Sequence, residues 1–370
     1  HPSFHLFNLS YFLYLSFLLC SHLSFLRHFY HRYLLLNHII AYFLHRLFFT
    51  RNSFVYVGTK HHKVMAKYLL LALLVAMRLY AAKYMIIADC DESFNYWEPL
   101  NFLLRGFGKQ TWEYSPEYAI RSYSYLWPYY LVAKALPSTS SGIDVFYFLR
   151  FTLLCGTTAF TEYRLYSSVS RAWGTKTANW FLFYTSVALG MQHASVALLP
   201  SSFAMNWVTL ATSSAIDAMK PAQNIPKFTA AAALIQFAIA GIVGWPFALA
   251  LAGPFGIYIS GYGLRFDPKW LLQTVTIVIA AVSAICAVVI AIDTHYYQKS
   301  AFVPLNIVLY NVFGGEGEGP EIFGVEDFLY YPMNLILNFN GIFPLAVLGT
   351  VFVPFVVGKS GFVTVSMPLF

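Results

Sequence analysis

Carboxylates, aromatic rings and cations gather in one stretch of the chain, residues 89–121. It begins DCDESFNYWEP, which places Asp89, Asp91 and Glu92 within four positions. A carboxylate can act as a general base that removes the proton of a hydroxyl group, while flat aromatic side chains stack on sugar rings. Arginine and lysine of the same stretch could hold a phosphate group. These residue types favour the chemistry of sugar transfer; the alternative is a solvated loop that ends a helix and anchors in lipid headgroups.

The composition of the chain indicates where such a stretch must lie. Of its 370 residues, 58% are hydrophobic and 11% are charged, and the mean hydropathy is +0.59. A soluble domain carries about 25% charged residues, so this chain has too little charge to cover a water-soluble fold. The basic residues behind the net charge of +7 are scattered between apolar runs, which argues against binding nucleic acid. The sequence therefore predicts an all-α protein that crosses the lipid bilayer several times.

The acidic residues occupy two short windows of the sequence. None precedes Asp89, although nine lysines and arginines do. Six of the 16 acids then lie between residues 89 and 117, and five more lie between residues 316 and 327. A carboxylate is costly in hydrocarbon, so both windows must lie outside the bilayer core or line an aqueous cavity.

Apolar runs of about 20 residues predict the membrane-spanning helices. The expected spans are 64–87, 144–163, 178–198, 200–217, 228–244, 246–262, 271–292 and 333–357. Lysines before the first span, and basic residues in alternate connections, place those connections on the cytosolic side. Because six spans separate the two acidic windows, both windows are expected on the same non-cytosolic side.

Two segments do not fit this alternation. Residues 123–137 are apolar but too short to span, and their tyrosines and tryptophan favour a position in the membrane interface. Residues 1–62 hold nine of the eleven histidines in an atypical aromatic mixture, in which no chemistry is predicted; a histidine store for metal ions is a weaker alternative. The four cysteines form no CxxC pair, so neither a structural metal nor a disulfide framework is predicted.

Several long motifs in residues 63–370 resemble glycosyltransferase family 22. They are DCDESFNYWEPLNFLLRGFGKQTWEYSPEYAIRSY at 89–123, GWPF at 244–247, IDTHYYQK at 292–299 and YNVFGGEGEGPEIFGVEDFLYYPMNLILNFN at 310–340. The resemblance covers about residues 64–350 and implies a polytopic helical fold of the GT-C type. Its active site would lie in lumenal loops at about 88–143 and 293–332. Family members continue with further helices and a lumenal region, so we expect the C-terminal part of the family to be missing here.

The resemblance also implies a reaction. The donor would be dolichyl-phosphate-mannose, and the acceptor would be a dolichyl-diphosphate-linked oligosaccharide in the endoplasmic reticulum membrane. Transfer would invert the anomeric centre and form an α-1,2 linkage, for protein N-glycosylation. Such a displacement needs one general base and a phosphate leaving group, so neither a metal nor a cofactor is expected.

Within the first motif, the family pattern assigns roles to particular residues. It places the base on Asp91, with Glu92 as the second candidate; Glu92 could instead orient Asp91 or bond backbone amides. Asp89 is expected to cap the junction between helix and loop. Arg121 could hold the donor phosphate, and its alternative role is an ion pair with Glu117, four residues earlier.

The resemblance also implies a set of substrate-binding candidates with aromatic or hydrogen-bonding side chains. They are Trp97, Trp112, Tyr114, Arg121, Asp293, His295 and Tyr297. Interfacial packing is the alternative for the aromatic residues of the first motif, and a structural role is the alternative for His295. Trp245 is expected in a lumenal turn, with substrate contact as one role. The glycine-rich segment 314–324 lacks a nucleotide-binding pattern and is expected to be mobile and to contact the acceptor.

Other functions stay open at this point. Another member of the same family would act on the same glycan through an α-1,6 linkage, or on a glycosylphosphatidylinositol precursor. A secondary transporter would place charges at mid-membrane and show internal symmetry, whereas this chain has no evident repeat and its acids cluster at helix exits. An inactive fragment that packs with a full-length partner is the third alternative.

Overall fold

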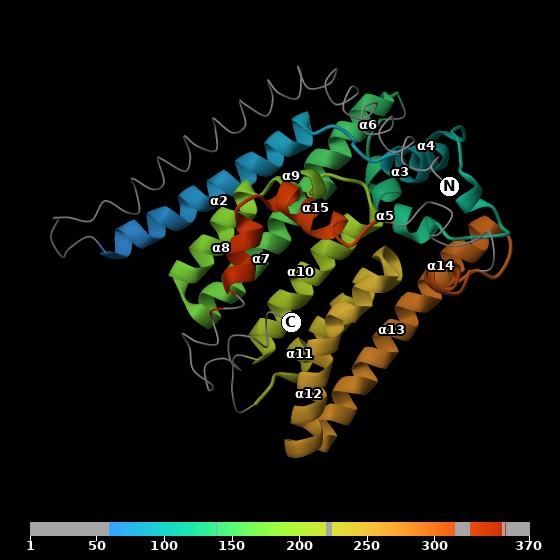
Figure 1. Cartoon of the computed structure of the whole chain (residues 1–370). Helices are drawn as coiled ribbons and strands as arrows, with labels where there is room; N and C mark the ends of the chain where they lie inside the picture. Colours follow the sequence, from blue (N-terminus) through green and yellow to red (C-terminus); the bar gives the residue numbers. More distant parts are fainter. Residues whose placement is uncertain (1–58, 138, 220–223, 315–325, 350–351, 353–370) are drawn as a thin grey trace, which may run out of the picture. The chain divides into compact units, whose positions relative to one another are not determined.

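The structure is a computed structural model that describes residues 59–137, 139–219, 224–314, 326–349 and 352 (Figure 1). Every regular element in these ranges is a helix. The prediction of an all-α protein is therefore confirmed. The atypical segment 1–62 lies almost wholly outside the described residues, and so does most of the glycine-rich segment.

Five helical stretches in the described ranges are long and apolar enough to cross a membrane. They are Met65–Tyr84, Gly142–Trp173, Lys227–Gly244, Pro246–Phe266 and Pro268–Tyr297. The helices that form them are α2 (Thr59–Tyr84), α6 (Gly142–Leu149) with η3 (Arg150–Leu154) and α7 (Cys155–Trp173), α11 (Lys227–Ile239) with η4 (Ala240–Gly244), η5 (Pro246–Ala252) with α12 (Gly253–Phe266), and α13 (Pro268–Tyr297). Five of the predicted spans are matched by these stretches.

The predicted spans 178–198 and 200–217 are not among the five. The first is broken, because α8 (Thr175–Val187) ends where Ala188 adopts an extended backbone and only the short α9 (Leu189–Ala194) follows. The break frees the carbonyl oxygen of Ser186, which accepts a 2.5 Å hydrogen bond from the Gln192 side chain. The second, α10 (Pro200–Met219), is a continuous 20-residue helix whose many serines and threonines lower its hydropathy.

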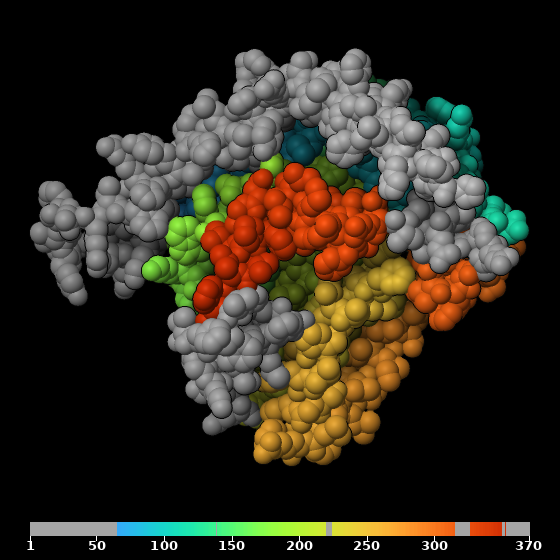
Figure 2. All heavy atoms as spheres, in the orientation of Figure 1, coloured from blue at the N-terminus to red at the C-terminus, as the bar shows by residue number. Residues whose placement is uncertain are grey.

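The predicted span 333–357 is bent rather than straight. Its two described helical pieces, α15 (Tyr330–Phe339) and Ile342–Gly349, meet at an angle of 113°. Asn340 lies at the bend with a φ of 49°, through which a right-handed helix cannot continue. This segment, red in Figure 2, lies on the outside of the helices, and α15 packs against α9.

The segment 123–137, predicted to lie in the membrane interface, forms a short helix with one face buried in the protein, and its position relative to a membrane stays a prediction. As expected, α5 (Tyr123–Ala133) has 11 residues and is too short to span. Its Tyr125, Leu126 and Tyr129 nevertheless pack inside the protein against α4 (Glu98–Arg105) and α6, where they are 6% exposed or less. Together with Leu100 and Leu149, these side chains form a hydrophobic core beneath the first loop.

A buried ion pair joins three of the helices. Arg78 of α2 donates to both carboxylate oxygens of Glu162 on α7, with nitrogen–oxygen distances of 2.5 and 3.0 Å. It also donates to the carbonyl of Thr185 on α8 at 2.8 Å. Both charged side chains are almost inaccessible, so each offsets the desolvation cost of the other.

Removing one member of this pair is expected to destabilise the protein strongly. Arg78→Met leaves the Glu162 carboxylate buried without its partner, which should lower the free energy of unfolding by about 3–5 kcal/mol. The double variant with Glu162→Met should recover most of that loss, because no lone charge remains. Unfolding in mixed micelles measures both.

The matched control is the more exposed ion pair of Arg171 and Asp217, 2.6 Å apart. Arg171→Met should change the free energy of unfolding by at most about 1 kcal/mol. An equal loss in Arg78→Met and Arg171→Met would contradict a special role for the buried pair.

Candidate active site

A cleft of about 370 Å³ lies where the first loop meets α14 (Val303–Phe313) and the turn after η4. Its lining combines carboxylates, one guanidinium, amides and aromatic rings. The lining residues are Asp91, Phe94, Asn95, Thr111, Trp112, Glu113, Ile120, Arg121, Trp245, Ile307, Tyr310 and Asn311. Two candidate membrane spans, α2 and α13, end close to it in sequence, at Tyr84 and Tyr297.

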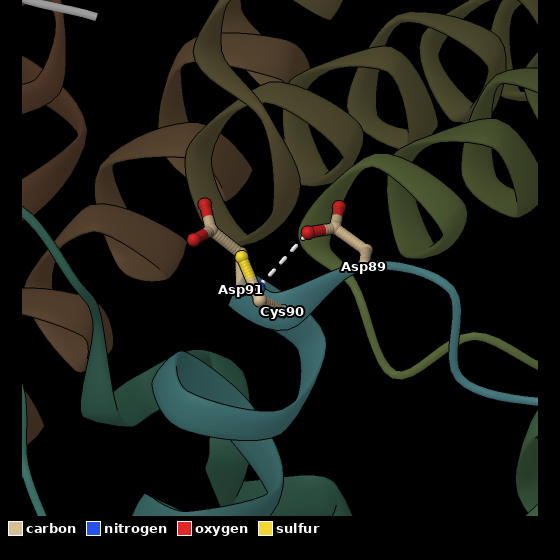
Figure 3. Close-up of side chains that lie close together, drawn as sticks. All are labelled: Asp89, Cys90 and Asp91. Carbon is tan, nitrogen blue, oxygen red and sulfur yellow. Dashed lines mark hydrogen bonds between the residues drawn. The ribbon is translucent and has the colours of Figure 1, made fainter. Parts of the chain in front are cut away.

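Asp91 is held at the first turn of a short helix, α3 (Cys90–Glu92). The Asp89 carboxylate accepts a 2.9 Å hydrogen bond from the backbone N–H of Asp91 (Figure 3). The predicted capping role of Asp89 is thus confirmed, because a carboxylate satisfies a free N–H at a helix start. The Asp91 side chain remains 53% exposed and faces the cleft.

Arg121 binds two carboxylates and a hydroxyl group. Its Nε and one Nη donate to the two oxygens of Glu113 at 3.0 and 2.7 Å, and the same Nη lies 3.3 Å from Asp91. Its other Nη donates to the Tyr96 hydroxyl at 2.6 Å. The alternative pairing with Glu117 is wrong, because residues 117–121 are not helical and four positions do not make one turn.

The end of α13 holds the backbone beneath Arg121. The Tyr297 hydroxyl donates to the Arg121 carbonyl at 2.6 Å. The Asp293 carboxylate accepts from the Ser122 hydroxyl at 2.8 Å and from the Ser124 N–H at 3.0 Å, at the start of α5. Asp293 and Tyr297, predicted as substrate-binding residues, are therefore buried beneath the cleft and do not line it.

His295 lies away from these contacts. Its side chain is exposed, contacts the ring of Tyr296 edge-on, and is not part of the cleft lining. The helical period explains the separation, because Asp293 and Tyr297 are four residues apart on one face of α13 and His295 points elsewhere.

Glu92 is buried, at 2% exposure, and it bonds a backbone amide, which was the alternative to a role as the base. One carboxylate oxygen accepts from the Trp97 indole N–H at 2.9 Å and from the backbone N–H of Leu198 at 3.0 Å. It thereby ties the first loop to the segment before α10. Trp97 packs against Phe146 of α6, and neither Glu92 nor Trp97 lines the cleft.

The other two aromatic candidates are divided between wall and core. Trp112 is 46% exposed, lines the cleft, and contacts the rings of Tyr118 and Tyr310 with centroids 4.9 and 5.9 Å apart. Tyr114 is buried and donates to the Asn95 carbonyl at 2.7 Å, which agrees with the alternative that it packs inside the protein.

Four residues of the arrangement were not singled out from the sequence: Glu113, Tyr96, Tyr310 and Asn311. Glu113 lies in the acidic window without any spacing that marks it. Tyr310 and Asn311 begin the motif YNVFGG, and that motif is the signal that could have identified them. Residues 315–325, which hold three of the five acids of the second window, lie outside the described residues. The expectation that both windows lie on the same side of the membrane therefore stays a prediction.

The surroundings of Asp91 alter its basicity. Partial burial raises the pKa of its carboxyl above the ordinary value for aspartate. Arg121 opposes this rise in the pKa, whereas the negative charges of Glu113 and Asp89 add to it. A raised pKa brings a carboxylate closer to the basicity that general-base catalysis at neutral pH requires.

The start of α3 also groups ligand-type atoms of Asp89, Cys90 and Asp91, within 4.8 Å of one another (Figure 3). All three side chains are exposed, and the Asp89 carboxylate already caps the helix. We therefore assign no metal to them. The three described cysteines, Cys90, Cys155 and Cys286, are free thiols.

Comparison with known proteins gives a consistent result. The model of the Alg9-like mannosyltransferase family matches residues 69–370. The chain is 39% identical over 280 residues to "Alpha-1,2-mannosyltransferase alg9" of Schizosaccharomyces pombe, covering 73% of this chain and 45% of that protein. It is 38% identical to "Alpha-1,2-mannosyltransferase ALG9" of Homo sapiens, covering 74% and 42%, and 38% identical to that of Saccharomyces cerevisiae, covering 76% and 50%.

The chain thus spans about half the length of these curated relatives, or less. No solved structure matches it.

The support beneath Arg121 can be tested through Asp293. Asp293→Asn removes the negative charge and one of the two acceptor oxygens, so the bonds from Ser122 and Ser124 lose their charge assistance, and the Ser122 hydroxyl must reorient to accept from the new N–H₂ group. We expect the free energy of unfolding to fall by about 1–3 kcal/mol. Backbone hydrogen exchange should become faster in residues 121–126 and stay unchanged in α2.

His295→Asn on the exposed side of the same helix is the control. It should leave both the exchange rates and the free energy of unfolding within about 0.5 kcal/mol of the parent protein. Unchanged exchange in residues 121–126 of Asp293→Asn would show that α13 does not hold this segment.

Proposed function

The chain belongs to the Alg9-like mannosyltransferase family, and on this basis we propose that the protein transfers mannose from dolichyl-phosphate-mannose to a dolichyl-diphosphate-linked oligomannose. The transfer forms an α-1,2 linkage and serves protein N-glycosylation. It takes place at the lumenal face of the endoplasmic reticulum membrane, which the protein crosses several times. The α-1,2 linkage is supported by the relatives from Schizosaccharomyces pombe and Homo sapiens, which are named α-1,2-mannosyltransferases.

The position of the cleft supports lipid-linked substrates. Asp91 follows the end of the α2 span within a few residues, and the α13 span ends in direct contact with the backbone of Arg121. Substrates whose sugars are attached to dolichol carry those sugars at the headgroup level. A cleft at the exits of two spans is placed to receive them.

Asp91 is the general base in this proposal, and the observation that carries it is its exposed carboxylate in an aromatic cleft. The carboxylate accepts the proton of the acceptor hydroxyl as that oxygen bonds to the anomeric carbon of mannose. The bond from this carbon to the phosphate oxygen breaks at the same time, and dolichyl phosphate leaves with the electron pair. Attack opposite the leaving group converts the β-linked donor into an α-linked product.

The other two candidate carboxylates are already engaged. Glu113 uses both oxygens to bind Arg121, and Glu92 is buried against Trp97 and Leu198. Neither could approach a sugar hydroxyl without losing these bonds. Asp91 has one long contact with Arg121 and half of its surface exposed, so it alone of the three is accessible.

Aromatic rings on the cleft wall supply the sugar-binding surface. Trp112, Tyr310 and Trp245 come from three separate parts of the chain and line the same cleft. Their flat faces can stack on pyranose rings, while Asn95, buried beside them, and Asn311 offer amides for hydroxyl groups. The acceptor glycan would lie against this wall with one hydroxyl directed to Asp91.

Expression in cells that lack the endogenous transferase tests the activity. The full-length gene should extend the stalled lipid-linked glycan by one or two hexoses, as read by mass spectrometry. Asp91→Asn should abolish the extension, because the amide cannot accept the proton, while the protein still accumulates in the membrane. Normal product from Asp91→Asn would remove Asp91 as the base, and no product from the parent gene would refute the proposed function.

The pH dependence provides a separate test of Asp91. Activity should fall as the pH decreases through the pKa of its carboxyl, because only the ionised form accepts a proton. Asp89→Asn removes a negative charge that raises this pKa, while asparagine remains a good helix cap. The acid limb of kcat/KM against pH should therefore move to lower pH. Glu117→Gln, in an exposed position of the same loop, is the control that should not move it; an unshifted limb in Asp89→Asn would argue against Asp91.

A further inference from the structure

The guanidinium of Arg121 is nearly saturated by the protein itself. Four of its hydrogen bonds go to Glu113, Asp91 and Tyr96, which leaves one of its five N–H groups for any other partner. Its side chain is 15% exposed and that of Glu113 is 13% exposed. An arginine committed in this way is poorly placed to receive a phosphate group, the role that the family resemblance suggested.

The charge of the cleft leads in the same direction. Asp91, Glu113 and Arg121 are the charged residues of its lining, with two negative charges and one positive charge. A phosphate that approached Arg121 would meet both carboxylates at close range. Displacing either one would leave a partly buried carboxylate without its cation, which is costly.

We propose that Glu113 and Arg121 form a positioning pair that fixes the Asp91 carboxylate for proton abstraction, and that Arg121 does not bind the donor phosphate. This inference rests on the proposed function, in which Asp91 is the base. Glu113 is the new residue that it adds to the site. Both members of the pair act through Asp91 and do not touch the reacting atoms.

Several contacts hold the pair rigid. The two-pronged bond between Glu113 and Arg121 fixes the plane of the guanidinium, as a single bond from a lysine could not. Glu113 lies on the short helix η2 (Trp112–Tyr114). Two hydrogen bonds tie this helix to Asn95: the Tyr114 hydroxyl donates to the Asn95 carbonyl, and the hydroxyl of the preceding residue, Thr111, donates to the Asn95 side chain at 2.6 Å.

The consequence for Asp91 is an oriented carboxylate with one oxygen available. Arg121 contacts Oδ2 at 3.3 Å, and the other oxygen, Oδ1, has no hydrogen-bond donor within the described part of the chain. Oδ1 is thus available for the acceptor hydroxyl. Misplacing a catalytic group by about 1 Å can cost about 100-fold in rate, so this orientation matters for turnover and not for donor affinity.

Steady-state kinetics of the purified full-length protein separate positioning from phosphate binding. The variants are Glu113→Gln, Arg121→Lys and the double variant, with Glu117→Gln as the exposed control; dolichyl-phosphate-mannose is varied at saturating acceptor. Both single variants should lower kcat by about 10- to 100-fold with the donor KM within about twofold of the parent. The double variant should lose no more than the worse single variant, because the two residues act as one unit.

The opposite pattern would overturn the inference. If Arg121 binds phosphate, Arg121→Lys should raise the donor KM more than tenfold, and Glu113→Gln should lower it by removing a competing anion. Full activity of Glu113→Gln would equally refute the positioning role. If Glu113→Gln does not accumulate, Glu113→Asp provides the test, because its shorter side chain keeps the charge but cannot reach both Arg121 nitrogens. A parental kcat in Glu113→Asp would count against the proposal.

Failure of this inference is distinguishable from failure of the proposed function. If the parent protein transfers mannose and Asp91→Asn does not, the function stands whatever the kinetics of the Glu113 and Arg121 variants. If the parent protein transfers nothing, the proposed function fails first.

Discussion

The ion pairs of Arg121 are the interaction on which the arrangement of the cleft depends. They join Asp91 at the start of the first loop to Glu113 near its middle, and the 21 residues between the two form irregular chain and short helices. The Glu113 carboxylate is largely buried and is costly without a cation, and the more exposed Asp91 carboxylate contacts the same cation. One guanidinium with a planar fork of donors can serve both, and it thereby sets their separation. The loop is folded around this charge.

Long apolar helices supply the frame that keeps Arg121 in place. Asp293 and Tyr297 lie one turn apart at the end of α13, and both bind the backbone of residues 121–124. At the other end of the loop, Arg150 donates to the carbonyls of Ala81 and Met85 at 3.3 and 2.8 Å, where α2 ends. Hydrocarbon offers no hydrogen-bond partners, so polar side chains at the ends of the helices satisfy the backbone groups there. These side chains thereby hold the loop at both ends.

The same need to satisfy charge explains the pair of Arg78 and Glu162 among the helices. Both residues lie within predicted spans, and nothing in the sequence indicates a partner for either. Residues 84 positions apart cannot be paired by spacing alone, and only the packing of α2 against α7 and α8 brings them together. The carboxylates outside the spans, by contrast, are recognisable because they cluster in the sequence.

The all-α membrane class, the family and five of the spans could be predicted from the sequence alone, because hydropathy and long motifs are local properties. The sequence also located Asp91 and the cap formed by Asp89. The folded structure was needed to show that Asp293 and Tyr297 support the loop from beneath, that Glu92 is buried against Leu198, and that Glu113 is the main partner of Arg121. The first two assignments depend on contacts between distant segments and on which face of a helix turns inward, which no residue pattern within one segment can specify. The third depends on the irregular path of the loop, which brings Glu113 to Arg121 across eight positions.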